Sequence, residues 1–328
     1  MMRKRTLSYL LKVLVGGIIL LLLARSMDLS LVLQLFAHLN LYWLALALMI
    51  VLSLRMLMAV RWQYILAAHA FPVPLLELTR ITFISTSLGQ VLPGGLGADV
   101  AKGYQLFRKY GRLGNVTVTL LLDRLIGLYS MFFVAFVGSL IAKHLGLSTN
   151  LVVPLLVAQA VFIFGWFGIY LVRKKISTLA FLRRSRYERL AHKFMGLLSD
   201  LTDLATIKSV FVRIFAISIL MQVLRAIIFY CIYQAFGHSA DMIYYLVFIP
   251  IVFVVVMLPV SVGGLGVREG ALVFFFKTLG IPNEVSISVG VMFLVVQIVA
   301  AVPGIVLWIV DKQPKTGLVP VEANEPTC

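Results

Sequence analysis

The chain has 328 residues, of which 61% are hydrophobic and 13% are charged. Soluble domains are usually about half apolar and about a quarter charged, so this composition excludes an ordinary soluble protein and indicates a membrane protein. Lys and Arg outnumber Asp and Glu by 29 to 13. We assign this excess to cytoplasmic loops and tails and expect no nucleic-acid partner. The two cysteines, Cys231 and Cys328, support neither a disulfide framework nor a metal cluster.

The apolar segments predict an all-α, polytopic membrane protein with six full spans. A spanning helix needs about 20 apolar residues, and we place spans near 7–24, 41–60, 116–142, 151–172, 210–234 and 285–310. The basic start followed by an apolar run has the order of a signal peptide. Because no small-residue cleavage site follows it, we interpret this segment as an uncleaved first span.

The distribution of basic residues predicts the orientation of the spans. Six crossings place the following residues on one side of the membrane: Arg3, Lys4, Arg5, Arg61, Arg80, the basic residues of 173–208, Lys312 and Lys315. The loops on the other side, 28–40, 143–150 and 237–241, contain almost no Lys or Arg. Cytoplasmic loops are enriched in these residues, so both termini are expected to be cytoplasmic.

A basic connector divides this single membrane domain of residues 1–328 into two halves. The N-terminal half is 1–172, the connector 173–209, the C-terminal half 210–312 and the short cytoplasmic tail 313–328. Apolar residues recur in the connector at three- and four-residue spacing, which predicts an amphipathic helix on the anionic cytoplasmic surface. A surface helix that serves only as a topology signal explains the same pattern.

Two apolar segments are interrupted by glycine and proline. Residues 81–92 would form a helix of about 18 Å, too short for a hydrocarbon layer of about 30 Å. The chain resumes toward basic residues, so we predict a re-entrant hairpin from the cytoplasm. The second segment, 243–258, breaks and resumes as far as Gly280, and two full spans around it would give the same topology. The breaks contain Pro93, Gly94, Gly95 and Gly97 in the first segment, and Pro259, Ser261, Gly263, Gly264 and Gly266 in the second.

Both breaks share Leu-Pro, then Gly-Gly-Leu-Gly, then an acid, which is Asp99 in the first and Glu269 in the second. The same broken-helix motif entering from opposite faces of the membrane predicts an inverted repeat. Paired glycine and proline interruptions are also typical of the central substrate site of a transporter. The helix after each break directs its free N–H groups inward, which suits a phosphate. Alternatively, Asp99 and Glu269 only cap these helix starts.

Charged residues within the spans predict a polar cavity. Each costs about 3 kcal/mol on insertion scales when unpaired, so these residues must face one another or water. In the functional interpretation, cations attract an anionic headgroup and acids set its selectivity; the cations are Arg55, Lys102, Arg124, Arg225 and Arg268, and the acids Asp99, Asp123 and Glu269. Structural ion pairing is the alternative, and Arg225 can also snorkel. We expect no metal, cofactor or catalytic activity, because no metal-ligand spacing or nucleophile–base pair is present.

The segments from Pro93 to Lys102, Asp123 to Leu128 and Pro259 to Glu269 together resemble the transmembrane domain family of lysylphosphatidylglycerol synthase. The run from Gly263 to Glu269 is the most specific part of a resemblance that covers nearly the whole chain. It implies residence in the bacterial inner membrane and movement of phospholipids between leaflets. Two departures matter. Only a short polar tail follows Asp311, so lysine transfer is not expected. Lys102 stands where the resemblance to the family leads us to expect Arg. A lysine keeps the positive charge but cannot form the two parallel hydrogen bonds that an arginine makes to a phosphate.

The sequence therefore predicts a lipid flippase for an anionic or zwitterionic phospholipid, or a polyprenyl-linked lipid. No nucleotide-binding loop is present, so transport is expected to be passive or ion-coupled. The alternative from another class is a non-catalytic accessory subunit that presents lipid to a separately encoded lipid-modifying enzyme, such as a transferase or glycosyltransferase. An intramembrane transferase has the least support, because the sequence offers no ordered set of acid, base and nucleophile.

Overall fold

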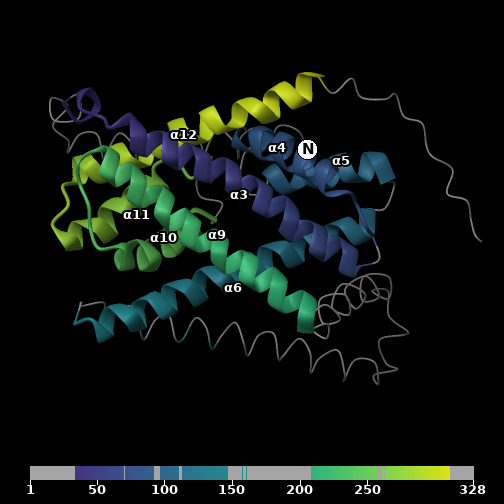
Figure 1. Cartoon of the computed structure of the whole chain (residues 1–328), viewed down its shortest axis with the longest axis horizontal. Helices are drawn as coiled ribbons and strands as arrows, with labels where there is room; N and C mark the ends of the chain where they lie inside the picture. The colour runs from purple at the N-terminus through teal and green to yellow at the C-terminus, as the bar shows by residue number, and fades with distance from the viewer. Residues whose placement is uncertain are drawn as a thin grey trace, which may run out of the picture.

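The computed structural model describes residues 34–69, 71–91, 97–110, 113–146, 157, 160, 208–257, 261 and 263–310. Within these residues every regular element is a helix, as the sequence predicts (Figure 1). The elements are α3 (Leu41–Ala68), α4 (Leu75–Val91), α5 (Gly97–Tyr110), α6 (Leu113–His144), α9 (Lys208–Ala235), α10 (Met242–Met257), α11 (Val267–Phe276), the 3₁₀ turn η2 (Lys277–Leu279) and α12 (Asn283–Val310).

Four of the described helices are long and apolar enough to cross a membrane, namely α3, α6, α9 and α12. They confirm the predicted spans at 41–60, 116–142, 210–234 and 285–310, and α3 continues eight residues further than predicted, to Ala68. The spans predicted at 7–24 and 151–172, the connector and the tail lie outside the described residues, apart from isolated helical positions 157 and 160.

The four long helices run in two opposite directions. The Asn40 N–H donates to the Ala235 carbonyl at 3.0 Å, so the start of α3 lies beside the end of α9 and the two helices are antiparallel. By contrast, α6 and α9 run in the same direction, and α12 runs with α3 (Figure 1). Two described spans therefore cross each way, which agrees with the order of crossings predicted from the charge distribution.

The first interrupted segment is an antiparallel hairpin of α4 and α5. The Gln105 side chain donates to Ser85 at 2.8 Å, and the Tyr110 hydroxyl donates to Glu77 at 3.0 Å near the open end. Burial and the neighbouring Glu77 carboxylate raise the pKa of Tyr110 to about 12. The predicted start near residue 81 was wrong, since α4 begins at Leu75. Its 17 residues still extend only about 25 Å.

The second interrupted segment is an antiparallel hairpin of α10 and α11. The Tyr245 ring lies 5.1 Å from the Phe276 ring between centroids, so the start of α10 lies against the end of α11. Gly264 has a φ of 75°, and a Cβ there would lie 2.6 Å from a Val256 methyl group. Only glycine fits this tip. With 16 and 10 residues, α10 and α11 are both shorter than a full span, which favours the re-entrant topology of the two that the sequence left open.

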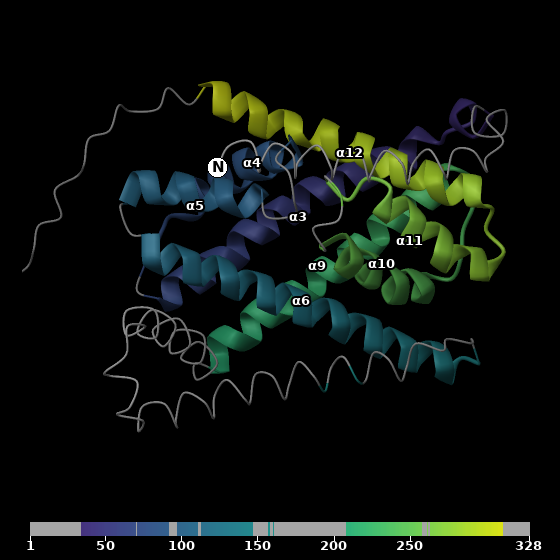
Figure 2. The same cartoon turned by 180° about the vertical axis from the view of Figure 1, so that it is seen from behind.

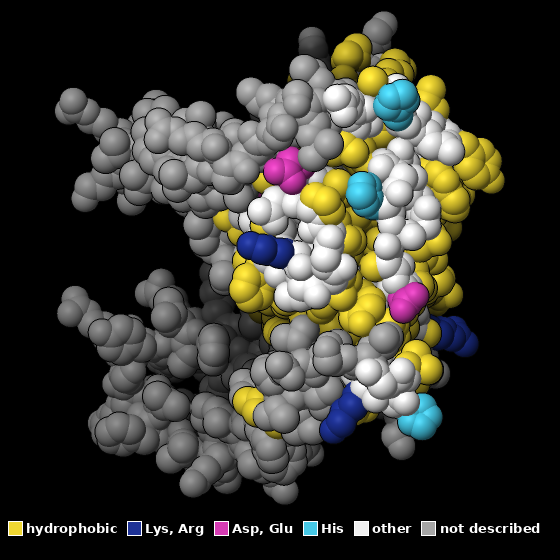
Figure 3. Space-filling view, turned by 90° about the vertical axis from the view of Figure 1, so that its left-hand side faces the viewer, with side chains coloured by type: hydrophobic (Ala, Val, Ile, Leu, Met, Phe, Trp, Pro, Cys, Tyr) yellow, Lys and Arg dark blue, Asp and Glu magenta, His cyan; other side chains and the backbone are white. Residues whose placement is uncertain are grey.

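The two hairpins enter the bundle from opposite ends (Figure 2). The helix α4 follows the end of α3, and α10 follows the end of α9, which lies at the other end because α3 and α9 are antiparallel. This is the arrangement that the predicted inverted repeat requires, although the repeat itself stays a prediction. Figure 3 views the end with the α9–α10 turn, where charged side chains lie singly among apolar and uncharged ones on the described surface.

Candidate functional site

Each of the three predicted acids pairs with one arginine. Asp123 Oδ1 accepts from Arg61 Nε at 2.7 Å, and Glu269 Oε1 accepts from Arg268 Nη2 at 2.5 Å. Asp99 pairs with Nε of Arg124, so the adjacent residues 123 and 124 serve different neighbours. Two of these acids pair with arginines of other helices, Asp123 of α6 with α3 and Asp99 of α5 with α6, whereas Glu269 pairs within α11.

Arg61 is a site residue that the sequence analysis misplaced. We expected it in a cytoplasmic loop, but it lies within α3 with only 5% of its surface exposed. It binds Asp123 of α6, and its Nη1 donates to Ser218 of α9 at 3.1 Å. The apolar sequence after Arg61, beginning with Trp62, and the need of Asp123 for a partner were the signals that could have placed it inside the helix.

At the second break, Glu269 is enclosed by its own turn. Its Oε2 accepts the Gly266 N–H at 2.6 Å, and its Oε1 binds both Nε and Nη2 of Arg268. The backbone N–H of Arg268 donates to the Gly264 carbonyl at 2.9 Å. A Cβ at Gly290 would lie 2.8 Å from Glu269, so α12 closes over this carboxylate. The capping alternative therefore describes Glu269, and this helix start does not offer these N–H groups to a phosphate.

The backbone residues of the second break hold this cap in place. Gly263 and Gly266, like Gly264, have positive φ angles. The Ser261 hydroxyl is buried and has no hydrogen-bond partner among the described residues. Pro259 lies outside the described part of the chain.

The first break is organised differently, because its acid, Asp99 of α5, pairs with a residue of another helix, α6. Gly97 begins α5, and Asp99 in its first turn reaches Arg124 of α6. Their side chains are 20% and 24% exposed, whereas Glu269 is fully buried. Pro93, Gly94 and Gly95 lie outside the described residues. The Asp99–Arg124 pair is thus accessible, and the Arg268–Glu269 pair is not.

Arg55 is buried in α3 and satisfied by backbone carbonyls of α12. Its Nη1 donates to the Ala300 carbonyl at 2.5 Å, and its Nη2 to the Gln297 carbonyl at 3.5 Å. The guanidinium also lies 5.8 Å from the centre of the Phe83 ring. These contacts favour a structural role for Arg55, which is the alternative that the sequence left open.

Lys102 and Arg225 have no carboxylate partner in the described part of the chain. Lys102 is only 1% exposed, and the single described interaction of its ammonium is with the Trp62 ring, 5.4 Å away. Arg225 lies 4.4 Å from the centre of the Phe253 ring and donates to Gln222 at 2.8 Å. Neither an aromatic ring nor a neutral amide supplies the negative charge that would neutralise a buried cation.

The family model of the lysylphosphatidylglycerol synthase TM region matches residues 9–304 of the chain. The chain belongs to this family. The match includes both breaks and all eight charged residues predicted to line the cavity, so the resemblance inferred from the sequence is confirmed. No curated protein matches the chain.

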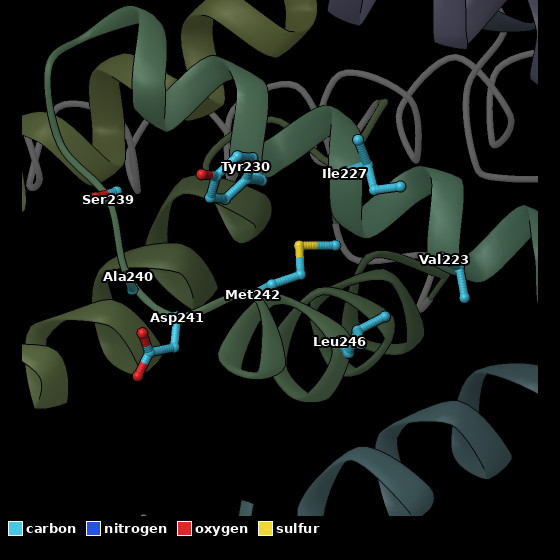
Figure 4. A pocket seen from close by; sticks show the side chains of 8 residues that line it. All are labelled: Val223, Ile227, Tyr230, Ser239, Ala240, Asp241, Met242 and Leu246. Carbon is cyan, nitrogen blue, oxygen red and sulfur yellow. The ribbon is translucent and has the colours of Figure 1, made fainter.

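In this member of the lysylphosphatidylglycerol synthase TM family, two of the eight predicted charged residues, Asp123 and Arg225, lie where α3, α6 and α9 meet. Arg61, Asp123 and Arg225 belong to this region, and Lys102 reaches it through Trp62. A cavity of about 720 Å³ lies elsewhere, where α10 faces the end of α9 (Figure 4). None of the predicted site residues lines that cavity. Among the described residues, no three His, Cys, Asp or Glu side chains lie close enough to hold a metal ion.

Proposed function

We propose that this protein moves a phospholipid with a negatively charged phosphate between the leaflets of the bacterial inner membrane, with both termini in the cytoplasm. The observation that carries the proposal is a surplus of positive charge inside the helix bundle. Three arginines neutralise the three acids, and three further cations have no described carboxylate partner: Arg55, Lys102 and Arg225. Uncompensated charge is costly at this depth, and an anionic ligand would offset it.

The opposed hairpins support a transport role. Broken helices at membrane depth are tolerated when they pack in protein or line a wet cavity, and transporters place their substrate sites at such breaks. The accessible Asp99–Arg124 pair joins the first hairpin to α6. In our proposal the headgroup passes near this pair while the acyl chains remain in the bilayer, and no chemical bond is broken, so the protein is not an enzyme.

A second function follows from the family description, which names the membrane region of a lipid synthase. In this alternative the chain presents lipid to a separately encoded lipid-modifying enzyme and moves none by itself. Purified protein without partners distinguishes the two functions.

The test is a vesicle assay with purified protein in phosphatidylcholine and a trace of headgroup-labelled fluorescent phosphatidylglycerol. A membrane-impermeant quencher reaches the labelled lipid of the inner leaflet only if the protein moves that lipid outward. We expect wild-type protein to expose this pool. If the labelled lipid of the inner leaflet stays protected from the quencher under proton gradients of either sign, the flippase is refuted and the accessory role remains.

The matched variants for this assay are Lys102→Met and Lys109→Met on α5. Lys102→Met removes a buried cation that has no described acid, and transport should fall by about tenfold or more. Lys109 is 59% exposed and already paired with Glu77, so Lys109→Met should transport like wild type. Normal transport by folded Lys102→Met would contradict a role for this cation.

A further inference from the structure

A directed chain of hydrogen bonds connects Arg225 of α9 to the backbone of α6. Arg225 Nη1 donates to Gln222 Oε1 at 2.8 Å, and Gln222 Nε2 donates to Ser130 Oγ at 3.1 Å. Ser130 gives its own hydrogen to the Gly127 carbonyl at 2.7 Å. Because the Ser130 hydroxyl donates its hydrogen to Gly127, it can only accept from the Gln222 NH₂ group. The Gln222 carbonyl oxygen therefore faces Arg225.

This chain holds the charge of Arg225 without neutralising it. Gln222 is the one described hydrogen-bond acceptor of Arg225, and it is neutral. The Phe253 ring lies over the guanidinium of Arg225, 4.4 Å from its central carbon. The N–H groups that do not bond Gln222 point outward in the plane of the guanidinium. Arg61, which reaches the same face of α9 through Ser218, has its own acid in Asp123. The neutral amide of Gln222 therefore bonds Arg225, the arginine on this face of α9 that has no described acid.

A second arginine, Arg61, reaches the same face of α9. Ser218, Gln222 and Arg225 follow one another on one face of α9, and Arg61 donates to Ser218 at 3.1 Å. Arg61 also lies against Gly127 of α6, where a Cβ would be 3.5 Å from its Nη1. Arg61 and Arg225 therefore reach the same face of α9, where Asp123 balances the charge of Arg61 and no described acid balances that of Arg225.

We propose that Arg225 binds the phosphodiester group of a membrane lipid, and that Gln222 is a positioning residue that orients Arg225 and leaves its charge available. The ligand class rests on the proposed lipid-transport function. The guanidinium fork suits a phosphate because it presents parallel N–H donors to two oxygens. Glutamate at position 222 would fit the same space, but it would form an ion pair with Arg225 and compete with the phosphate.

The test measures phosphatidylglycerol binding to purified full-length protein in phosphatidylcholine nanodiscs, together with the unfolding temperature. In Gln222→Glu we expect roughly tenfold to hundredfold weaker binding and an unchanged or higher unfolding temperature. A purely structural role for Gln222 predicts unchanged binding in a folded variant. Wild-type affinity in Gln222→Glu overturns the proposal.

Gln234→Glu is the matched control, because it makes the same change twelve residues further along α9. The Gln234 amide contacts only the Tyr230 hydroxyl, at 2.9 Å, among the described residues. We expect this variant to bind phosphatidylglycerol like wild type. Equal loss of binding in both variants would show a general charge effect and overturn the assignment to Gln222.

Two further arms make the result decisive. If Gln222→Glu does not fold, Arg225→Gln replaces it, and wild-type affinity of that variant overturns the proposal. Inorganic phosphate is tested as a separate ligand. Binding of phosphate but not phosphatidylglycerol, with the same dependence on Gln222, overturns a lipid site. Binding is measured without transport, so the two proposals can fail separately. Inactive vesicles would refute the flippase and leave the binding site intact. Transport unaffected by Gln222→Glu would refute the binding site and leave the flippase intact.

Discussion

The Arg61–Asp123 pair shows how a buried charge depends on its partner. Both side chains are less than a tenth exposed, and their atoms are 2.7 Å apart. Asp123→Asn would leave Arg61 with Ser218 as its main described partner. Breaking a buried pair in this way typically costs about 3–5 kcal/mol. We expect a large fall in the unfolding temperature of the protein in detergent.

Asp99→Asn is the control for this prediction at the same scale. The Asp99–Arg124 pair is about one-fifth exposed, so water can solvate Arg124 after the change. The loss of stability should be clearly smaller, because accessible pairs contribute about 1 kcal/mol or less. An equal loss in the two variants would contradict the difference in burial. Transport is expected to fall in Asp99→Asn even though the fold persists.

Side-chain partners were the least predictable part of the site. The cost of an unpaired charge in a membrane correctly predicted that Asp123 needs a neighbour, but periodicity identifies a helix face and not the helix opposite it. Arg61 was therefore placed in a loop although it binds Asp123. Gln222 and Ser130 escaped notice for another reason. They are neutral, and their role is visible only through their contact with Arg225.

At the scale of elements, α4 is anchored to α12 by close backbone packing. A Cβ at Gly304 would overlap with the Phe83 carbonyl oxygen and the Ser87 hydroxyl. The same Ser87 hydroxyl contacts the Ala301 carbonyl at 2.9 Å, and the Gln90 side chain donates to the Gln297 carbonyl at 2.8 Å. The first hairpin is thus fixed to α12 through α4, while α5 pairs with α6 through Asp99.

Gly304→Ala should separate α4 from α12. The added methyl meets backbone and not a flexible side-chain end, so we expect a loss of about 1–3 kcal/mol or more in stability. Gly270→Ala in α11 is the control, because nothing lies within 4 Å of a Cβ there. It should be neutral or stabilise the helix by roughly 0.5–1 kcal/mol. Unfolding temperatures measure both effects, and equal values for the two variants would argue against this packing.

The hairpins were predictable as elements because glycine and proline interrupt apolar runs that are too short to span. Their limits were less predictable. Arg80 suggested a loop before residue 81, but it lies one turn into α4. The difference between the breaks was also hidden, because Asp99 and Glu269 follow the same motif. Glu269, three residues after the last glycine of its motif, binds its own turn, and Asp99, two residues after the corresponding glycine, binds a neighbouring helix. Similar motifs thus lead to a closed cap in one case and an accessible pair in the other.

At the scale of the whole molecule, the composition predicted the membrane class, and the relative directions of the four described long helices agree with the predicted series of spans. The structure adds that the two hairpins point toward each other from opposite ends (Figure 1). Alternating access through an inverted pair of hairpins requires this arrangement. It also makes the orientation of the protein testable without knowing the lipid.

Single cysteines at Arg108 and Lys277 should be labelled from opposite sides of the membrane. Both positions are exposed, Arg108 near the end of α5 and Lys277 just after α11. With Cys231 and Cys328 replaced by serine, an impermeant maleimide should label Lys277→Cys in right-side-out vesicles. It should label Arg108→Cys only in inverted vesicles, because the orientation that we propose places the basic end of the hairpin in the cytoplasm. Labelling of both from one side would mean that the hairpins enter together, which would contradict the inverted arrangement and the alternating mechanism based on it.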